Sequence, residues 1–346
     1  MNFLSSQIVR PFAFILLSVS LLPACSRKDN IAPQSTTNVY VVGNEYDTVK
    51  LWKNGIAENL TNGTLPSYAT SVYVSGSDVY VAGYTVNGVI TTASYWKNGV
   101  VTNLPGLHAS KRIFANSIFV SGNDVYVAGY ENGGIVGTDS AEYWKNGVPT
   151  SLNPSGGNEC LAYSIFVSGS NVYVAGTELV GNSIPTAISW KNGTVGSLTT
   201  TSTTAYGYSN FVAGNDVYVA GYEIMSGVNG TAKYWKNGVA TSLTDGNYNA
   251  YASSVFVLGN DAYVAGAEQS GPGGNGIAKY WKNGIATNLT DGTNDAEANS
   301  IYVSGIDVYV VGYDGGAAVI WKNGKETLLT NGKTNAVAQA VFVTNN

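Results

Sequence analysis

The stretch Trp235-Lys236-Asn237-Gly238 is one of seven copies of the same four residues; the others begin at Trp52, Trp96, Trp144, Trp190, Trp281 and Trp321. The copies lie 40 to 48 residues apart and account for every tryptophan of the chain. Repeats of this length are typical of solenoids, propellers and arrays. The chain is therefore expected to consist of seven similar units.

A second phrase, Val-Tyr-Val-x-Gly, accompanies each Trp-Lys-Asn-Gly, and only Ala262 departs from its leading Val. One unit contains four short apolar segments, at 217–221, 232–235, 239–243 and 254–257. Asn-Gly between two apolar segments is a strong signal for a β-hairpin with a type I′ turn, whose two central residues need positive φ. Turn-forming residues, such as those from Ser121 to Asp124, join each Ser-Val-Phe-Val segment to the Val-Tyr-Val-x-Gly segment that follows it. Each unit is thus predicted to be a four-stranded antiparallel meander.

The two ends of the array predict how it closes. The first unit begins at Val39 with the Val-Tyr-Val-x-Gly strand, and no strand of the Ser-Val-Phe-Val type precedes it. The chain ends with such a strand, from Ala340 to Val343, and nothing follows to pair with it. A ring in which the last strand completes the first unit hides both strand edges. The predicted fold class is all-β: a seven-bladed β-propeller of four-stranded antiparallel blades over residues 38–346, its first blade closed by the C-terminal strand.

The N-terminal segment has the features of a targeting signal. Arg10 supplies positive charge, and an apolar run from Phe12 to Leu22 follows it. The run ends in Leu22-Pro23-Ala24-Cys25, which resembles the lipobox of bacterial lipoproteins. The resemblance implies a lipoprotein signal peptide at 1–24, acylation of Cys25, and a lipidated flexible tether at 25–37. The alternative is an ordinary secretory signal with an incidental cysteine.

The expected location is the outer membrane of the cell envelope, where a lipid anchor holds the protein. The sequence is compatible with either the periplasmic or the surface-facing side of this membrane. Ser26 stands where an aspartate would resemble an inner-membrane retention signal. We expect Cys25→Ala to leave the membrane fraction and to lose metabolic labelling by palmitate. Unchanged labelling and membrane retention would contradict acylation at Cys25.

Composition excludes several classes of function. The net charge is −5 and no Lys/Arg cluster is present, so nucleic acid is not an expected partner. Once Cys25 is acylated, Cys160 has no cysteine to pair with and is interpreted as a small buried residue. The chain has a single histidine, His108, and no nucleophile motif or His/Cys spacing for a metal. No metal or cofactor is expected. A non-enzymatic protein is favoured over an enzyme, and a monomer is the expected oligomeric state.

The repeats resemble the HAF-type extracellular repeats of bacteria. The residues that carry the resemblance are Tyr95 to Gly99, Leu104, and Val125 to Tyr130. It implies a propeller outside the cytoplasm and no particular activity. The seven Trp residues are interpreted as packing between blades, because one identical residue in every unit suits a repeated core position better than a single sugar-binding site.

Variation among the units falls on the loops opposite the short turns, and this loop face is the predicted binding surface. Two sets of side chains gather there. Aromatic residues before the innermost strand are candidate ligand contacts, with packing of the loop root as an equal alternative: Tyr68, Phe114, Tyr206 and Tyr251. Acids follow the Val-Tyr-Val-x-Gly strand, among them the candidates Glu131 and Glu178, and several acids near one axis could bind a cation through their oxygens. Cross-strand pairs such as Glu223–Lys233 explain these acids better.

Three functions are compatible with this pattern. The first is a cell-envelope lipoprotein acting as a non-enzymatic binding or scaffold propeller for a glycan or protein ligand. The second is a glycan-active hydrolase or lyase that uses loop-face carboxylates. The third is a structural or adhesive surface protein. A ring of the seven Trp-Lys-Asn-Gly lysines on the turn face is a competing site for an anionic polymer.

Overall fold

The computed structural model describes residues 36–108, 112–133, 139–153, 158–179, 184–200, 203–224 and 229–345. Contacts between Cα atoms divide the chain into Met1–Ser35 and Thr36–Asn346, and every described strand belongs to the second unit. The predicted signal peptide, Cys25 and most of the tether lie outside the described residues. None of the described residues forms a helix, and so none forms one long and apolar enough to cross a membrane.

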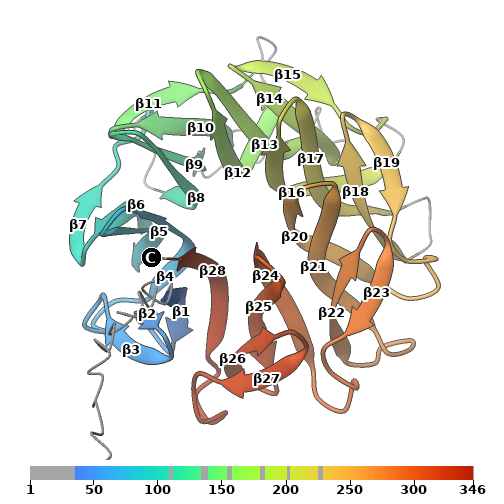
Figure 1. Cartoon of the computed structure of the whole chain (residues 1–346). Helices are drawn as coiled ribbons and strands as arrows, with labels where there is room; N and C mark the ends of the chain where they lie inside the picture. Colours follow the sequence, from blue (N-terminus) through green and yellow to red (C-terminus); the bar gives the residue numbers. More distant parts are fainter. Residues whose placement is uncertain are drawn as a thin grey trace, which may run out of the picture. The chain divides into compact units, whose positions relative to one another are not determined.

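The described chain is all-β and folds into four-stranded antiparallel groups that follow the repeats (Figure 1). Four consecutive strands pair in chain order within six of the groups. The first three of these are β4 (Ser67–Ser75), β5 (Asp78–Asn87), β6 (Ile90–Lys97) and β7 (Val100–Asn103); β8 (Arg112–Ser121), β9 (Asp124–Asn132), β10 (Ser140–Lys145) and β11 (Val148–Ser151); and β12 (Glu159–Ser168), β13 (Asn171–Leu179), β14 (Thr186–Lys191) and β15 (Thr194–Ser197). The next three are β16 (Thr204–Ala213), β17 (Asp216–Ile224), β18 (Gly230–Lys236) and β19 (Val239–Ser242); β20 (Ala250–Leu258), β21 (Asp261–Gln269), β22 (Gly276–Lys282) and β23 (Ile285–Asn288); and β24 (Ala296–Ser304), β25 (Asp307–Asp314), β26 (Ala317–Lys322) and β27 (Lys325–Leu328). A single parallel bridge, Thr91 to Arg112, joins the first two of these six groups into one eight-stranded sheet.

The remaining group combines the two ends of the described chain. Its strands, in spatial order, are β28 (Val337–Asn345), β1 (Thr37–Glu45), β2 (Thr48–Lys53) and β3 (Ile56–Asn59). β28 pairs antiparallel with β1 from Thr37↔Asn345 to Asn44↔Val337. β28 therefore stands where the first strand of a repeat stands in the other groups.

The Asn-Gly turns have the predicted geometry. In all seven, the Asn has φ between 50° and 52° and the Gly between 79° and 84°. The Asn side chain adds a second interaction: Asn237 Oδ1, for example, accepts from the backbone N–H of Val217 at 2.9 Å. The same bond occurs in every repeat. Asn237 Nδ2 also donates to Asp216 Oδ1 at 2.8 Å, a bond that an aspartate or glycine at this position could not make.

The predicted packing role of the seven Trp residues is confirmed. Each is at most 3 % exposed. Trp281, for example, belongs to an apolar cluster that combines Tyr218 and Ala220 of one sheet with Val255 of the next. The glycine of Val-Tyr-Val-x-Gly makes room for this packing, because a Cβ on Gly221 would lie 1.8 Å from the Tyr206 carbonyl oxygen and 3.2 Å from the Trp235 ring.

A β-bulge interrupts each strand that begins a group, namely β4, β8, β12, β16, β20, β24 and β28. One residue of each has no cross-strand partner: Thr70, Asn116, Tyr163, Tyr208, Ser253, Asn299 and Gln339. These seven strands also contact one another in sequence, and β28 contacts β4. A bulge re-aims the side chain of the extra residue, and here it places that residue beside the neighbouring group.

Candidate functional site

A cavity of about 420 Å³ lies among the strands that begin the groups, and we call it the cup. Its wall is built from side chains of β4, β16, β17, β20, β24 and β28: Thr70, Tyr208, Tyr222, Tyr251, Ser253, Glu297, Asn299 and Gln339. Five of these eight are bulge residues, so the bulges create much of this surface. Pockets that bind small molecules combine apolar rings with a few convergent polar groups, and the cup has this composition.

Seven aromatic side chains form a ring. Each lies three residues after the bulge residue of the strand that begins its group. Their ring centroids are 4.6 to 5.1 Å apart in an unbroken cycle: Tyr73, Phe119, Phe166, Phe211, Phe256, Tyr302 and Phe342, with Phe342 returning to Tyr73. Centroid distances of 4.5 to 7 Å are those of interacting aromatic pairs. We call this cycle the aromatic floor; none of its seven side chains is among those that line the cup.

The cup is acidic. Glu297 is its only charged side chain, and no Lys, Arg or His lines it. The hydroxyl of Tyr251 donates to Glu297, and burial together with this carboxylate raises the pKa of Tyr251. Tyr313 also hydrogen-bonds Glu297, and its hydroxyl donates to Asp295 Oδ2 at 3.1 Å. The tyrosines are therefore neutral and fixed, and the negative charge of Glu297 faces a wall of rings.

The predicted aromatic contacts lie near the innermost strands, but only Tyr251 lines the cup itself. Tyr206 lies behind the wall and stacks on Tyr222 at 5.1 Å and on Tyr208 at 5.9 Å. The other two belong to a separate row in which Tyr68, Tyr84, Phe114 and Tyr130 contact one another at 4.8 to 5.1 Å. Aromatic contacts therefore place Tyr206 in one group and Tyr68 with Phe114 in another, and the position of all four around one mouth stays a prediction.

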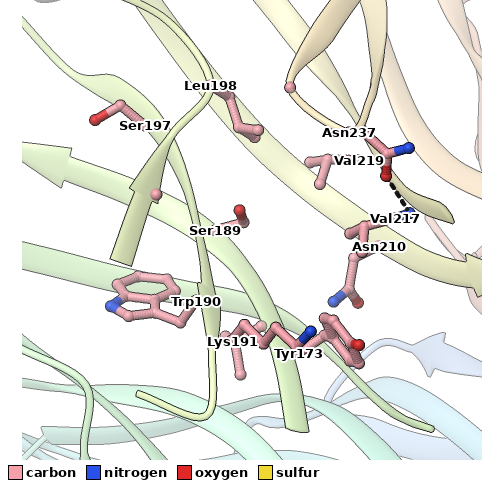
Figure 2. A pocket seen from close by; sticks show the side chains of 13 residues that line it. Tyr173, Ser189, Trp190, Lys191, Ser197, Leu198, Asn210, Val217, Val219 and Asn237 are labelled. Carbon is pink, nitrogen blue, oxygen red and sulfur yellow. Dashed lines mark hydrogen bonds between the residues drawn. The ribbon is translucent and has the colours of Figure 1, made fainter. Parts of the chain in front are cut away.

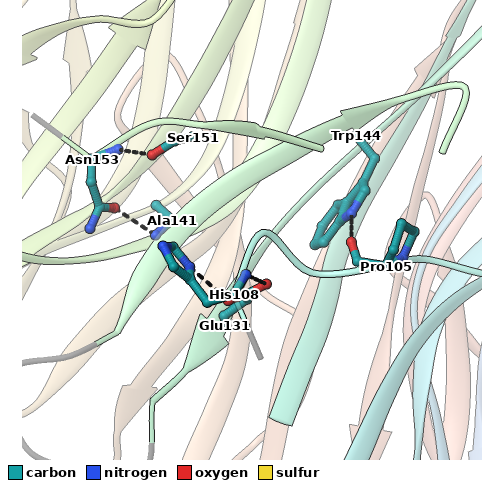
Figure 3. Close-up of polar contacts among 7 residues, drawn as sticks. All are labelled: Pro105, His108, Glu131, Ala141, Trp144, Ser151 and Asn153. Atoms are coloured by element: carbon teal, nitrogen blue, oxygen red, sulfur yellow. Dashed lines mark hydrogen bonds and ion pairs between the residues drawn. The ribbon is translucent and has the colours of Figure 1, made fainter. Parts of the chain in front are cut away.

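The acid candidate Glu131 is buried by its own loop and is 2 % exposed (Figure 3). Both of its carboxylate oxygens accept from the backbone N–H of His108 at 3.1 Å, and Oε2 lies 2.9 Å from the ring Nδ1. The loop fits closely, since a Cβ on Gly106 would lie 1.7 Å from Oε1. Glu131 is thus occupied in holding this loop and does not face a ligand.

Glu142 lies beside Glu131 at a position where three of the other repeats have a lysine. Glu45–Lys50 and Glu268–Lys279 form ion pairs at 2.5 Å, and Glu223 pairs with Lys233, so the predicted cross-strand pairing is confirmed there. Glu142 is 0 % exposed, and burial together with the Glu131 carboxylate raises its pKa to about 8. The second acid candidate, Glu178, accepts from Asn158 Nδ2 at 2.8 Å and does not line the cup. No cluster of metal-binding side chains occurs among the described residues.

The lysines of the turn face are mostly neutralised. Five form ion pairs with an aspartate at 2.7 to 2.8 Å: Lys97, Lys145, Lys236, Lys282 and Lys322. All seven also lie over the tyrosine of Val-Tyr-Val-x-Gly, 5.2 to 5.5 Å from the ring centroid. A strong positive field, which an anionic polymer requires, is therefore not expected on this face.

Sequence reasoning missed Tyr208, Tyr222 and the role of Glu297 in the cup. Glu297 and Tyr251 occupy the same repeat position, but Tyr208 lies at a bulge. A bulge changes which face a side chain occupies without a clear mark in the repeat pattern.

The fold defines a β-propeller-like class of all-β protein, and solved structures agree. The chain is similar to the Pyrococcus horikoshii acylaminoacyl peptidase, with a TM-score of 0.51, 11% identity, and 85% of this chain and 50% of that chain covered. A prolyl endopeptidase matches with a TM-score of 0.50 and 12% identity, over 90% of this chain and 50% of that chain. An acylaminoacyl peptidase in complex with Z-Gly-Gly-Phe-chloromethyl ketone matches with a TM-score of 0.51 and 11% identity, over 86% of this chain and 52% of that chain. The chain spans about half the length of these peptidases and matches their β-propeller domains. No family model and no curated protein matches.

These comparisons contradict the function predicted from the sequence. The similar chains are peptidases, not glycan-binding, glycan-degrading or adhesive proteins. The predicted role as a non-enzymatic binding or scaffold propeller for a glycan or protein ligand is therefore wrong, as are its two alternatives, while the address at the cell envelope stays a prediction. The physical reason is that seven nearly identical units specify a scaffold, while function depends on the few positions that differ.

Proposed function

We propose that the protein is a peptidase-related propeller that receives peptides in the cup and works beside a peptidase catalytic unit. The observation that carries the proposal is the likeness to the propeller half of acylaminoacyl and prolyl peptidases. Within the described residues, the single histidine is bonded to the buried Glu131, so the proposal assigns bond cleavage to another unit.

The proposal includes a closed ring of seven blades in which β28 completes the blade of β1, β2 and β3. Three observations support it. β28 pairs with β1, the aromatic floor is an unbroken cycle, and β28 contacts β4. A further series of bonds links neighbouring strands, in which a serine Oγ accepts from the next strand at 3.0 to 3.3 Å: Ser71, Ser117, Ser164, Ser209, Ser254 and Ser300. Ala340 takes the seventh position and lacks the hydroxyl.

In this proposal the aromatic floor closes one end of the cup, and we call a cup closed in this way blind. A peptide enters from the loop face and ends against the rings, so the end of the chain is the part recognised. An ammonium group is favoured by a carboxylate and by the faces of tyrosine rings. Glu297 with Tyr208, Tyr222 and Tyr251 offers this combination. We therefore assign the cup to the free amino terminus of a peptide.

Calorimetric titration with Gly-Gly-Phe-amide tests this assignment. We expect saturable binding, with acetyl-Gly-Gly-Phe-amide bound at least tenfold more weakly, because acetylation removes the charge. Glu297→Gln should also weaken the free peptide about tenfold, which corresponds to about 1.4 kcal/mol. Glu178→Gln is the control, since this carboxylate lies outside the cup. Equal binding of the two peptides, or no effect of Glu297→Gln, would refute the assignment.

A further inference from the structure

A second cavity, of about 280 Å³, lies away from the cup between the fourth and fifth repeats, and we call it the inter-sheet pocket (Figure 2). One side is formed by the sheet of β12 to β15, with Tyr173, Ser189 and Leu198. The other side is formed by Asn210 of β16 and Val217 and Val219 of β17. The lining of the pocket is specific to this pair of repeats, because several of its residues depart from the repeat pattern.

Two substitutions in the repeat change the lining of this pocket. Ser189 stands where the other repeats have a large side chain: Leu51, Tyr95, Tyr143, Tyr234, Tyr280 and Ile320. Those four tyrosines pack against the apolar clusters between their sheets and fill the corresponding volume. Gly196 stands where the others have Glu58, Thr102, Thr150, Thr241, Thr287 and Thr327. A missing ring and a missing side chain on the same side leave the groove open.

A third substitution gives the pocket a buried hydrogen-bond donor. Asn210 replaces an aliphatic residue that every other repeat has at this position: Val72, Ile118, Ile165, Val255, Ile301 and Val341. It is 6 % exposed, and its Oδ1 accepts from Ser164 Oγ at 2.8 Å. Its Nδ2 has no hydrogen-bond partner. Buried polar groups are nearly always satisfied, so an unpartnered amide at a cavity wall points to an acceptor from outside the chain.

A fourth substitution leaves a positive charge at the same pocket. Lys191 is one of two turn-face lysines without an aspartate, because Asn171 stands where five repeats have Asp. Among the described contacts, the Lys191 ammonium has only the Tyr173 ring, 5.5 Å from the centroid. The pocket therefore offers an ammonium, a buried amide donor and apolar walls, and none of the residues that line it is acidic.

We propose that the inter-sheet pocket binds a small carboxylate with an apolar body. Asn210 Nδ2–H donates to one carboxylate oxygen, the ammonium of Lys191 supplies the opposite charge, and the apolar part lies against Leu198, Val217 and Val219. The site is separate from the cup, so it does not depend on the proposed peptide binding.

The chain contains its own comparison site. A groove of about 260 Å³ occupies the same position between the first and second repeats, with Leu51 in place of Ser189. Lys53 there also lacks an aspartate, since Asn38 takes its place. It differs from the inter-sheet pocket in having the carboxylate of Glu58 in its lining and Val72 at the position of Asn210. The same ligand should therefore avoid it.

Titration with phenylacetate tests the proposal, with affinities of the parent and all variants measured by calorimetry and the Asn210 side-chain amide followed by NMR in the chains that keep Asn210. We expect a saturable shift, with the neutral analogue phenylacetamide bound at least fivefold more weakly. Asn210→Val should weaken phenylacetate about tenfold, and Ser189→Tyr should abolish saturable binding. Both variants restore the residue type of other repeats, so they are expected to fold. The Lys191→Gln variant should bind phenylacetate only as tightly as the parent binds phenylacetamide.

Leu51→Tyr, which fills the comparison groove, is the matched control and should leave phenylacetate binding unchanged. Three results would overturn the proposal: no saturable shift at Asn210, which would leave water as its partner; equal affinity for phenylacetate and phenylacetamide; or full binding by Ser189→Tyr. Loss of binding in Leu51→Tyr alone would place the site in the other groove and would also refute it.

Discussion

A chain that ends at residue 336, and so lacks β28, is expected to lose its cooperative folding transition. β28 buries Ala338, Val341 and Val343 and supplies Phe342 to the aromatic floor. Full burial of one aliphatic side chain contributes roughly 1.5 to 3 kcal/mol, and the deletion also removes the whole hydrogen-bond ladder to β1. Domains are stable by only about 5 to 15 kcal/mol, so this loss is comparable with the whole free energy of unfolding.

Thermal and chemical denaturation, with light scattering for aggregation, measure this effect. The exposed edge of β1 is expected to promote association between chains. A rescue variant separates the loss of the strand from simple shortening: residues 337–345 are placed before Thr37 through a Ser-Gly-Asn-Asp turn like that at 121–124. This variant should recover the parent transition. A truncated chain that melts like the parent would show that β28 does not close the fold.

The second large effect is a dependence of stability on pH that originates at Glu142. Its pKa is raised from 4.5 to about 8 by burial and by the Glu131 carboxylate. A carboxyl group with a raised pKa in the folded state holds its proton more tightly there. Its cost to folding is therefore absent below pH 4.5 and grows as the pH rises toward 8. Between pH 4.5 and 7 the loss amounts to about 3 kcal/mol.

Glu142→Gln should remove this dependence, because glutamine does not titrate. Urea denaturation at pH 5, 7 and 8 provides the measurement, and the difference between variant and parent should grow with pH in favour of the variant. Glu178→Gln is the matched control: Glu178 has the same repeat position as Glu131, and Ile188 stands where Glu142 would be. A parent and a Glu142→Gln variant with parallel pH profiles would contradict the assignment.

The fold class could be predicted from the sequence because the local signals and the repeat agree. The Asn-Gly turns, the buried Trp residues and the glycine against the backbone carbonyl of the neighbouring strand recur in every unit, and each has one conformation that suits it. All-β architecture and four-stranded antiparallel groups are confirmed, and the match to peptidase propeller domains agrees with the propeller class.

The sites could be predicted less well, because they depend on departures from the repeat. Tyr208 reaches the cup through a bulge, and the bulge residue has no fixed type among the repeats. Glu131 was predicted as a candidate ligand contact on the loop face, but the loop around Gly106 and His108 covers it. Ser189 and Asn210 are single changes in a long pattern, and only the structure shows that both line one cavity.

Closure of the ring is the central claim, since the blind cup exists only if β28 pairs with β1. Thr37 and Asn345 face each other across this pair, with Thr37 Oγ1 3.0 Å from Asn345 Oδ1. The most direct measurement is disulfide formation in the double variant Thr37→Cys, Asn345→Cys, carried on a Cys25→Ala chain and analysed by mass spectrometry. The account predicts nearly complete intramolecular disulfide under native conditions, with a higher melting temperature than the reduced form. Only intermolecular disulfides, or none, would show that β28 does not lie against β1.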